Sequence, residues 1–269
     1  NYIFVFVLHW DIKGLAWASL LAQGVMFAVS LYFLYERTPY RFILTKSLHP
    51  KFFQSLRMSF DLIIRSSLLQ GVLYFSFLSA TKLGGGEDST IVATHTILNQ
   101  VWLFSVFLFD GYCNAGGLLS GRLYSTQQYQ TIRNLVKDLF YIVLTIGMVI
   151  LLVYFLFYHQ IGIFMTKNKD VQLLFFETFW IVVLMQPLNA ITFLFDGIYK
   201  GMGFTAILRN AFIIATFLGF FPTFYVTQSL LEWGLSGIWL TFFVWMAFRG
   251  GILIIHYINF FFNRPLQAG

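Results

Sequence analysis

The pentapeptide Phe-Leu-Phe-Asp-Gly occurs twice in this sequence, at residues 107–111 and 193–197, each time after a long apolar run. Both copies place a carboxylate next to a segment that is long enough to cross a membrane. A charged side chain at membrane depth is costly and persists only where it faces a protein interior or a watery cavity. Asp110 and Asp196 are therefore the first candidates for binding a cation.

The composition indicates a protein built for lipid. Charged residues make up 10% of the 269 residues, whereas a typical soluble domain has about 25%. A helix needs about 20 mainly apolar residues to cross the hydrocarbon core, because its backbone amides must be satisfied within the helix. We therefore predict an all-α, polytopic helical bundle. Its seven spans are expected at residues 15–35, 61–82, 91–110, 139–158, 173–195, 205–228 and 236–260.

The distribution of Lys and Arg predicts the orientation, because short loops rich in these residues stay in the cytoplasm. Alternate loops carry eleven basic residues on one side and four on the other. The loop 37–58 and the C-terminus are therefore expected to be cytoplasmic, and both Asp-Gly pairs lie toward the cytoplasmic ends of their spans. The net charge of +6 is explained by this topology, and no nucleic-acid partner is predicted.

Several chemistries are not supported by the sequence. Cys113 is the single cysteine, and the five histidines lack the i, i+4 spacing of a zinc site, so neither a metal nor a cofactor is predicted. No glycine-rich loop is followed by Lys and Ser or Thr, which argues against a nucleotide-driven pump. An intramembrane hydrolase could be built from the serines of the second span and His95, but hydroxyl residues are common at helix contacts. A secondary transporter is favoured.

Two pairs of polar residues share a helix face at i, i+4 spacing. Asp61 and Arg65 could pair at the start of the second span, or Arg65 could snorkel while Asp61 acts as a helix-start charge. Asp110 and Asn114 form the second pair in a glycine-rich stretch, and a helix-end role is the alternative for Asp110.

Asp196 has two interpretations as well. Lys200 lies four residues beyond it, so a salt bridge at the membrane surface is slightly favoured over a role in coupling. Arg249 lies deep in the last span and requires a carboxylate or water, although the sequence does not identify the partner.

Further polar residues and glycines within the spans are candidates for cavity lining and for helix packing. Pro187 interrupts the fifth span and predicts a kink there, and glycines four residues apart let helices approach closely. The cavity-lining candidates are Asn99, Gln100, Gln186, Asn189, Arg65 and Arg249, and the packing candidates are Gly111, Gly117, Gly121, Gly197 and Gly201.

Motifs along nearly the whole chain resemble one family, the multidrug and toxic compound extrusion (MATE) transporters. Residues 14–23 resemble the start of that family's sixth span, and residues 61–84 its seventh. Residues 107–121 are similar to the eighth span of the DNA-damage-inducible F branch. Residues 195–201 and 208–210 look like the end of the tenth span and the start of the eleventh.

This resemblance implies a twelve-span transporter, with two six-helix lobes around a central cavity, that exports organic compounds in exchange for H⁺ or Na⁺. Residues 1–13 would then be the end of a preceding span and an outer loop, and residues 14–36 the last helix of the N-terminal lobe. Residues 37–58 would be the inter-lobe loop and residues 59–269 the C-terminal lobe. The chain would thus be a fragment whose partners are the bilayer, an organic substrate and the missing N-terminal lobe.

The resemblance also implies a mechanism and leaves alternatives. Transport would proceed by alternating access in a cell (inner) membrane. The branch's best supported carboxylate lies in the first span, which is absent here, so coupling by Asp61, Asp110, Asp196 and Asn114 is a hypothesis. A lipid-linked oligosaccharide flippase is the alternative, although only Arg249 lies clearly within a span. An inactive fragment is the other alternative.

Overall fold

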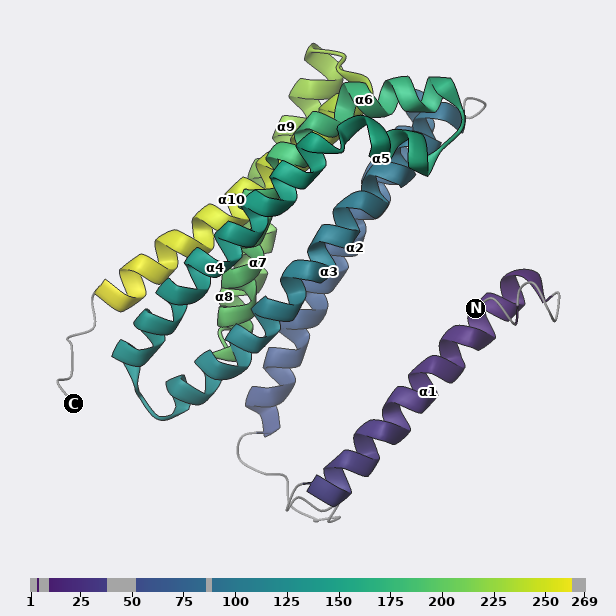
Figure 1. Cartoon of the computed structure of the whole chain (residues 1–269). Helices are drawn as coiled ribbons and strands as arrows, with labels where there is room; N and C mark the ends of the chain where they lie inside the picture. Colours follow the sequence, from purple (N-terminus) through teal and green to yellow (C-terminus); the bar gives the residue numbers. More distant parts are fainter. Residues whose placement is uncertain (1–3, 5–9, 38–51, 86–88, 263–269) are drawn as a thin grey trace. The chain divides into compact units, whose positions relative to one another are not determined.

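The computed structural model describes residue 4 and residues 10–37, 52–85 and 89–262. All regular structure in these ranges is helical, which confirms the predicted all-α class (Figure 1). Within these ranges six helices are long and apolar enough to cross a membrane, and counting one bent pair as a span gives the predicted seven. The chain divides into two units, Asn1–Phe52 and Phe53–Gly269.

The described part of the first unit contains one long helix, α1, which spans Asp11–Arg37. Its membrane-spanning part, Ala16–Arg37, agrees with the predicted span 15–35. The helix begins three residues before the predicted boundary at residue 14. Most of the predicted segment 1–13 and most of the loop 37–58 lie outside the described residues.

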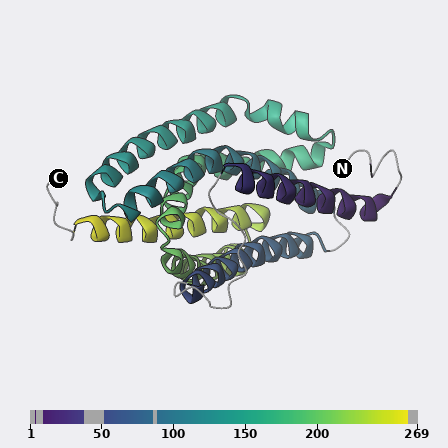
Figure 2. The same ribbon diagram turned by 90° about the horizontal axis from the view of Figure 1, so that it is seen from below.

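The second unit contains all the remaining helices. Its elements in chain order are α2 (Phe52–Leu83), α3 (Ser89–Ser125), α4 (Tyr129–Leu156), α5 (Tyr158–Met165), α6 (Lys169–Leu184), α7 (Gln186–Gly201), α8 (Thr205–Ile214), η2 (Ala215–Phe220), α9 (Phe221–Tyr225), η3 (Val226–Leu230) and α10 (Gly234–Phe262). The four elements from α8 to η3 form one span, Thr205–Leu230. Figure 2 shows α2 at the edge of this unit.

Two helices are longer than the apolar runs predicted. Helix α2 begins at Phe52, within the predicted loop, and the 37 residues of α3 continue to Ser125. At 1.5 Å per residue α3 is about 55 Å long, well beyond the roughly 30 Å of the hydrocarbon core. Hydropathy marks only the part of a helix that lies in lipid. Asp110 therefore lies inside a helix, and the helix-end interpretation of this residue is wrong.

The predicted kink in the fifth span is confirmed. Helices α6 and α7 together make one candidate span that is bent by 48°. Pro187 lies in the first turn of α7 and has no backbone N–H to donate across the break. The bend lets α7 follow a different direction from α6, and α7 carries Asp196.

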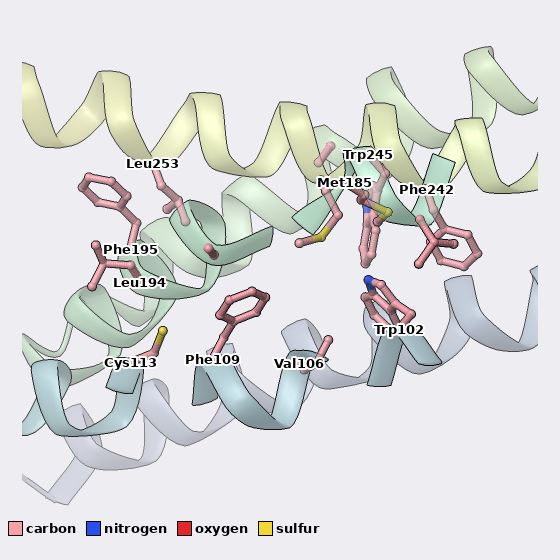
Figure 3. Close-up of a cluster of buried hydrophobic side chains, with 14 of the residues drawn as sticks. Trp102, Val106, Phe109, Cys113, Met185, Leu194, Phe195, Phe242, Trp245 and Leu253 are labelled. Atoms are coloured by element: carbon pink, nitrogen blue, oxygen red, sulfur yellow. The ribbon is translucent and has the colours of Figure 1, made fainter. Parts of the chain in front are cut away.

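The core of this unit lies where α3 faces α7 and α10 (Figure 3). Side chains at intervals of three or four residues place one stripe of α3 against the other two helices. The residues labelled in this view are Trp102, Val106, Phe109 and Cys113 on α3, Met185 just before α7, Leu194 and Phe195 on α7, and Phe242, Trp245 and Leu253 on α10.

Helices α3 and α7 touch through their backbones. A Cβ on Gly117 would meet the carbonyl oxygen of Gly197, and a Cβ on Gly121 would meet that of Gly201. These four glycines therefore form the close approach that their spacing predicts. Gly111 differs, because nothing among the described residues lies within 4 Å of a Cβ built there. The structure gives Gly111 no packing role in this unit.

We predict that Gly117→Ala destabilises the protein by about 1–3 kcal/mol, because the added methyl group meets backbone that cannot move aside. Gly111→Ala on the same helix is the control. It should leave stability unchanged or raise it by up to about 1 kcal/mol, the gain in helix propensity. Thermal unfolding of the two purified variants measures the difference, and equal melting temperatures would contradict the close crossing.

Candidate functional site

Asp196 is the centre of a buried ion cluster. Its side chain is only 6% exposed, and it lies on α7 between α2 and α10. Arg65 of α2 donates from Nη2 to Asp196 Oδ2 at 2.7 Å, and Arg249 of α10 donates from Nη2 to the same oxygen. One carboxylate thus joins three helices. It is also the partner of Arg249 that the sequence left unidentified.

Aromatic rings hold the two guanidinium groups of this cluster. The ring of Phe212 on α8 lies 3.9 Å from Cζ of Arg249 and 4.6 Å from Cζ of Arg65, measured to the ring centroid. Trp245 adds a second ring 5.0 Å from Arg249. Cation–π attraction is strongest where the cation is desolvated, and the side chain of Arg249 is 2% exposed. Helix α8 is thereby tied to the same cluster.

The cluster carries an excess of positive charge. Two guanidinium groups share one carboxylate oxygen, while Oδ1 of Asp196 and Nε of both arginines are buried without a hydrogen-bond partner in the described part of the chain. A buried charge is tolerated when it is paired or faces a polar cavity. The excess therefore requires polar surroundings next to the cluster.

A pocket of about 280 Å³ supplies these surroundings. It lies between α2, α3, α7 and α10, and its wall mixes charged, polar and apolar side chains. The charged ones are Arg65, Asp110, Asp196, Lys200 and Arg249, the uncharged polar ones include Gln70 and Asn114, and the apolar ones include Trp102, Val106 and Phe193. Asp110 is half-buried and, within the ranges that the structure describes, makes neither an ion pair nor a hydrogen bond.

A larger groove of about 600 Å³ adjoins this pocket. The two hollows share Asn114, Gly197 and Lys200 as lining residues, and the groove continues along α3 to Arg122. The glycines that let α3 and α7 touch also line this groove, so no side chain fills it at those positions. The groove therefore runs along α3 and α7 beside the pocket.

Asp61 forms a second ion cluster and does not line the pocket among the described residues. It is 2% exposed, pairs with Arg209 of α8, and accepts a hydrogen bond from Thr205 Oγ1 at 3.1 Å. The predicted Asp61–Arg65 pair is wrong, because each residue has a partner on another helix. The i, i+4 rule compares residues of one helix only, whereas buried charges pair across helices.

The predicted salt bridge between Asp196 and Lys200 is also wrong. Asp196 pairs with Arg65 and Arg249, and Lys200 is exposed at the edge of the pocket. The sequence placed only Arg249 clearly within a span. In the structure Arg65 is also largely buried, with 19% of its side chain exposed. A buried carboxylate pairs with cations that are buried beside it, here the two arginines. Lys200 instead lines the pocket.

Other candidates lie away from the pocket within the described residues. Asn99 is half-buried and Gln100 exposed on α3, while Gln186 and Asn189 are fully buried at the kink. Gln186 donates from Nε2 to the carbonyl oxygen of Val182 at 2.7 Å. A cavity-lining role for these four residues stays a prediction. Sequence reasoning missed Trp102 and Arg209, whose contacts come from other helices and leave no local signal.

The sequence model of the MatE family matches residues 63–225, more than half of the chain. The chain belongs to the MatE family. It is 25% identical to Protein DETOXIFICATION 44, chloroplastic, of Arabidopsis thaliana over 92% of this chain and 46% of that protein. It is 24% identical to DNA damage-inducible protein F of Escherichia coli K12 over 90% of this chain and 52% of that protein.

MatE structures show the same fold. A crystal structure of the Vibrio cholerae MATE transporter VcmN, a mutant form, superposes with a TM-score of 0.79 at 21% identity, over 99% of this chain and 60% of that one. The chain spans about half the length of the curated relatives it matches. The match confirms the predicted resemblance to this family. Because MatE proteins are membrane transporters and not enzymes, it also confirms that no enzyme is expected.

We predict that Asp196→Asn destabilises the protein by about 3–5 kcal/mol, because it leaves two buried guanidinium groups without their carboxylate. Asp110→Asn is the comparison, since Asp110 holds no ion pair in the described structure, and it should cost less than about 1 kcal/mol. Thermal unfolding of both purified variants decides between them. Equal losses would mean that the Asp196 cluster does not hold the helices together.

Proposed function

We propose that this chain forms the cation-coupling lobe of a secondary active transporter. The transporter would be an antiporter that exports drugs or other organic compounds in exchange for H⁺ or Na⁺ by alternating access. It would lie in a cell (inner) membrane with its C-terminus in the cytoplasm, as the distribution of Lys and Arg predicts. Membership of the MatE family supports the general function, and the site supports the coupling role.

The observation that carries the coupling role is the state of Asp110. Asp61 and Asp196 are buried and paired with arginines, so neutralising either would require an ion pair to break. Asp110 instead faces a polar pocket and makes no ion pair among the described residues. It can take up a cation without dismantling the fold. Asn114, one turn along α3, lines the same pocket and offers an amide beside it.

Cation uptake at Asp110 would change the charge of the pocket. Arg65, Lys200 and Arg249 face two carboxylates there, and neutralising Asp110 leaves three cationic groups against one carboxylate. Like charges in a partly desolvated pocket repel more strongly than in water. Each charge state would therefore favour a different arrangement of the pocket walls, and such a difference couples binding to conformation.

The partner of this chain in transport would be a second six-helix lobe. The relatives are about twice as long as the matching region, and the central cavity of such a transporter lies between two lobes. The proposed partners are thus that lobe, the bilayer and an organic cargo. A flippase for lipid-linked oligosaccharides is less well supported, because a pocket of about 280 Å³ is small for a headgroup of several sugars.

We predict that Asp110→Asn in the full-length protein abolishes export driven by an imposed pH or Na⁺ gradient, because the amide cannot take up the coupling cation. Dye transport in proteoliposomes with and without the gradient measures this. Asp138→Asn, an exposed carboxylate on α4, is the matched control and should transport normally. Gradient-driven transport that persists in Asp110→Asn would show that coupling lies elsewhere.

A further inference from the structure

Two oppositely charged side chains line the pocket without an ion pair in the described structure. Asp110 comes from α3 and Lys200 from α7, the two helices that touch at their glycines. Asp110 is half-buried on a short side chain, whereas Lys200 is exposed on a long one. A molecule in the pocket could therefore meet a fixed negative group and an adjustable positive group.

Coupling restricts what the cargo can place at Asp110. In an exchanger whose ion and cargo use the same carboxylate, binding of one displaces the other, so the two are carried in opposite directions. A cargo that competes with a cation for Asp110 must present a positive group of its own. An ammonium group meets this requirement, because it donates hydrogen bonds to a carboxylate and is released when the carboxylate is neutralised.

The charge of the pocket restricts the rest of the cargo. Three cationic groups face two carboxylates, so the wall is already positive by one charge. A cargo with only an ammonium group would add to this excess, whereas a carboxylate on the same molecule offsets it. Arg65 is the member of the Asp196 cluster best placed to receive that carboxylate. Its side chain is 19% exposed, compared with 2% for Arg249.

The volume of the pocket and its apolar wall restrict the size and shape of the cargo. The volume of about 280 Å³ lies just below the roughly 300–1,000 Å³ of pockets that hold drug-sized ligands. Trp102, Val106 and Phe193 make part of the wall apolar. Aromatic side chains of this kind pack well against flat apolar groups. A small molecule with one ring and two opposite charges matches all these features.

We infer that the cargo class of this pocket is a small aromatic zwitterion, with its ammonium group on Asp110 and its carboxylate on Lys200 and Arg65. This inference rests on the proposed function, because the competition with the coupling ion fixes the group at Asp110. It narrows the cargo from organic compounds in general to molecules that carry both charges.

Three probes of similar size separate the charges. L-phenylalanine carries both groups, 2-phenylethylamine only the ammonium group and 3-phenylpropionate only the carboxylate. Their binding to the full-length protein in nanodiscs is measured by calorimetry without any ion gradient. We expect L-phenylalanine to bind most tightly. Lys200→Gln should weaken L-phenylalanine and 3-phenylpropionate by about tenfold and leave 2-phenylethylamine unchanged or improved.

Asp110→Asn should act in the opposite sense on the two singly charged probes. It should weaken 2-phenylethylamine and L-phenylalanine by about tenfold and strengthen 3-phenylpropionate, because a negative group leaves the pocket. Lys137→Gln and Asp138→Asn are matched controls on α4, since both residues are exposed and neither lines the pocket. They should leave the binding of all three probes unchanged.

The inference is overturned if L-phenylalanine does not bind at millimolar concentration, if 2-phenylethylamine binds best, or if the pocket variants shift all three probes equally. These outcomes are independent of the transport assay. Normal gradient-driven transport by Asp110→Asn, combined with the expected binding pattern, would reject the coupling role and keep the site. Loss of coupling in that variant, combined with equal binding of the three probes, would keep the proposed function and reject the zwitterion.

Discussion

The second unit depends on one carboxylate. Asp196 is buried, and a buried carboxylate is stable only when cations pair with it, so Arg65 and Arg249 are drawn to the same oxygen. Because these residues lie on α2, α7 and α10, the electrostatic requirement of a single group fixes the relation of three helices. Phe212 brings α8 to the same point by stacking under both guanidinium groups. The pairing leaves one positive charge uncompensated, and the pocket beside the cluster gives that charge polar surroundings.

A second constraint explains why the free charges lie together. Gly117 and Gly121 on α3 meet Gly197 and Gly201 on α7 at backbone distance, so the crossing brings together residues that lie within about two turns of these glycines. Asp110 and Lys200 are such residues, and both line the pocket. In the described residues neither arginine pairs with Asp110, since both donate to Asp196 and lie against the ring of Phe212. Close helix contact places Asp110 in the pocket, and the pairing of both arginines with Asp196 leaves it without an ion pair among the described residues.

The sequence predicts those features that depend on local composition. The spans follow from apolar runs, the bend between α6 and α7 follows from Pro187, and the close crossing follows from glycine spacing. Which charged residues pair with each other cannot be predicted from local composition. Asp61 pairs with Arg209, 148 residues away, although Arg65 lies one turn from it on its own helix.

The ends of helices are missed for another reason. Residues 111–125 of α3 are too polar or too small to score as a span, yet they stay helical because they pack against α7.

Two kinds of contact, ion pairs and aromatic packing, hold α2 against the rest of the second unit. In the first half of α2, Asp61 and Arg65 bind α8 and α7 through ion pairs, whereas in its second half Phe75 packs against Phe220, Phe221 and Phe224. Contacts between aromatic rings depend mainly on buried area and ring geometry, whereas ion pairs respond directly to any charge nearby. Arg65 belongs both to the Asp196 pair and to the pocket wall, opposite Asp110. A change of charge in the pocket would therefore act on α2 through Arg65 in its first half, and not through the aromatic contacts of Phe75 in its second half.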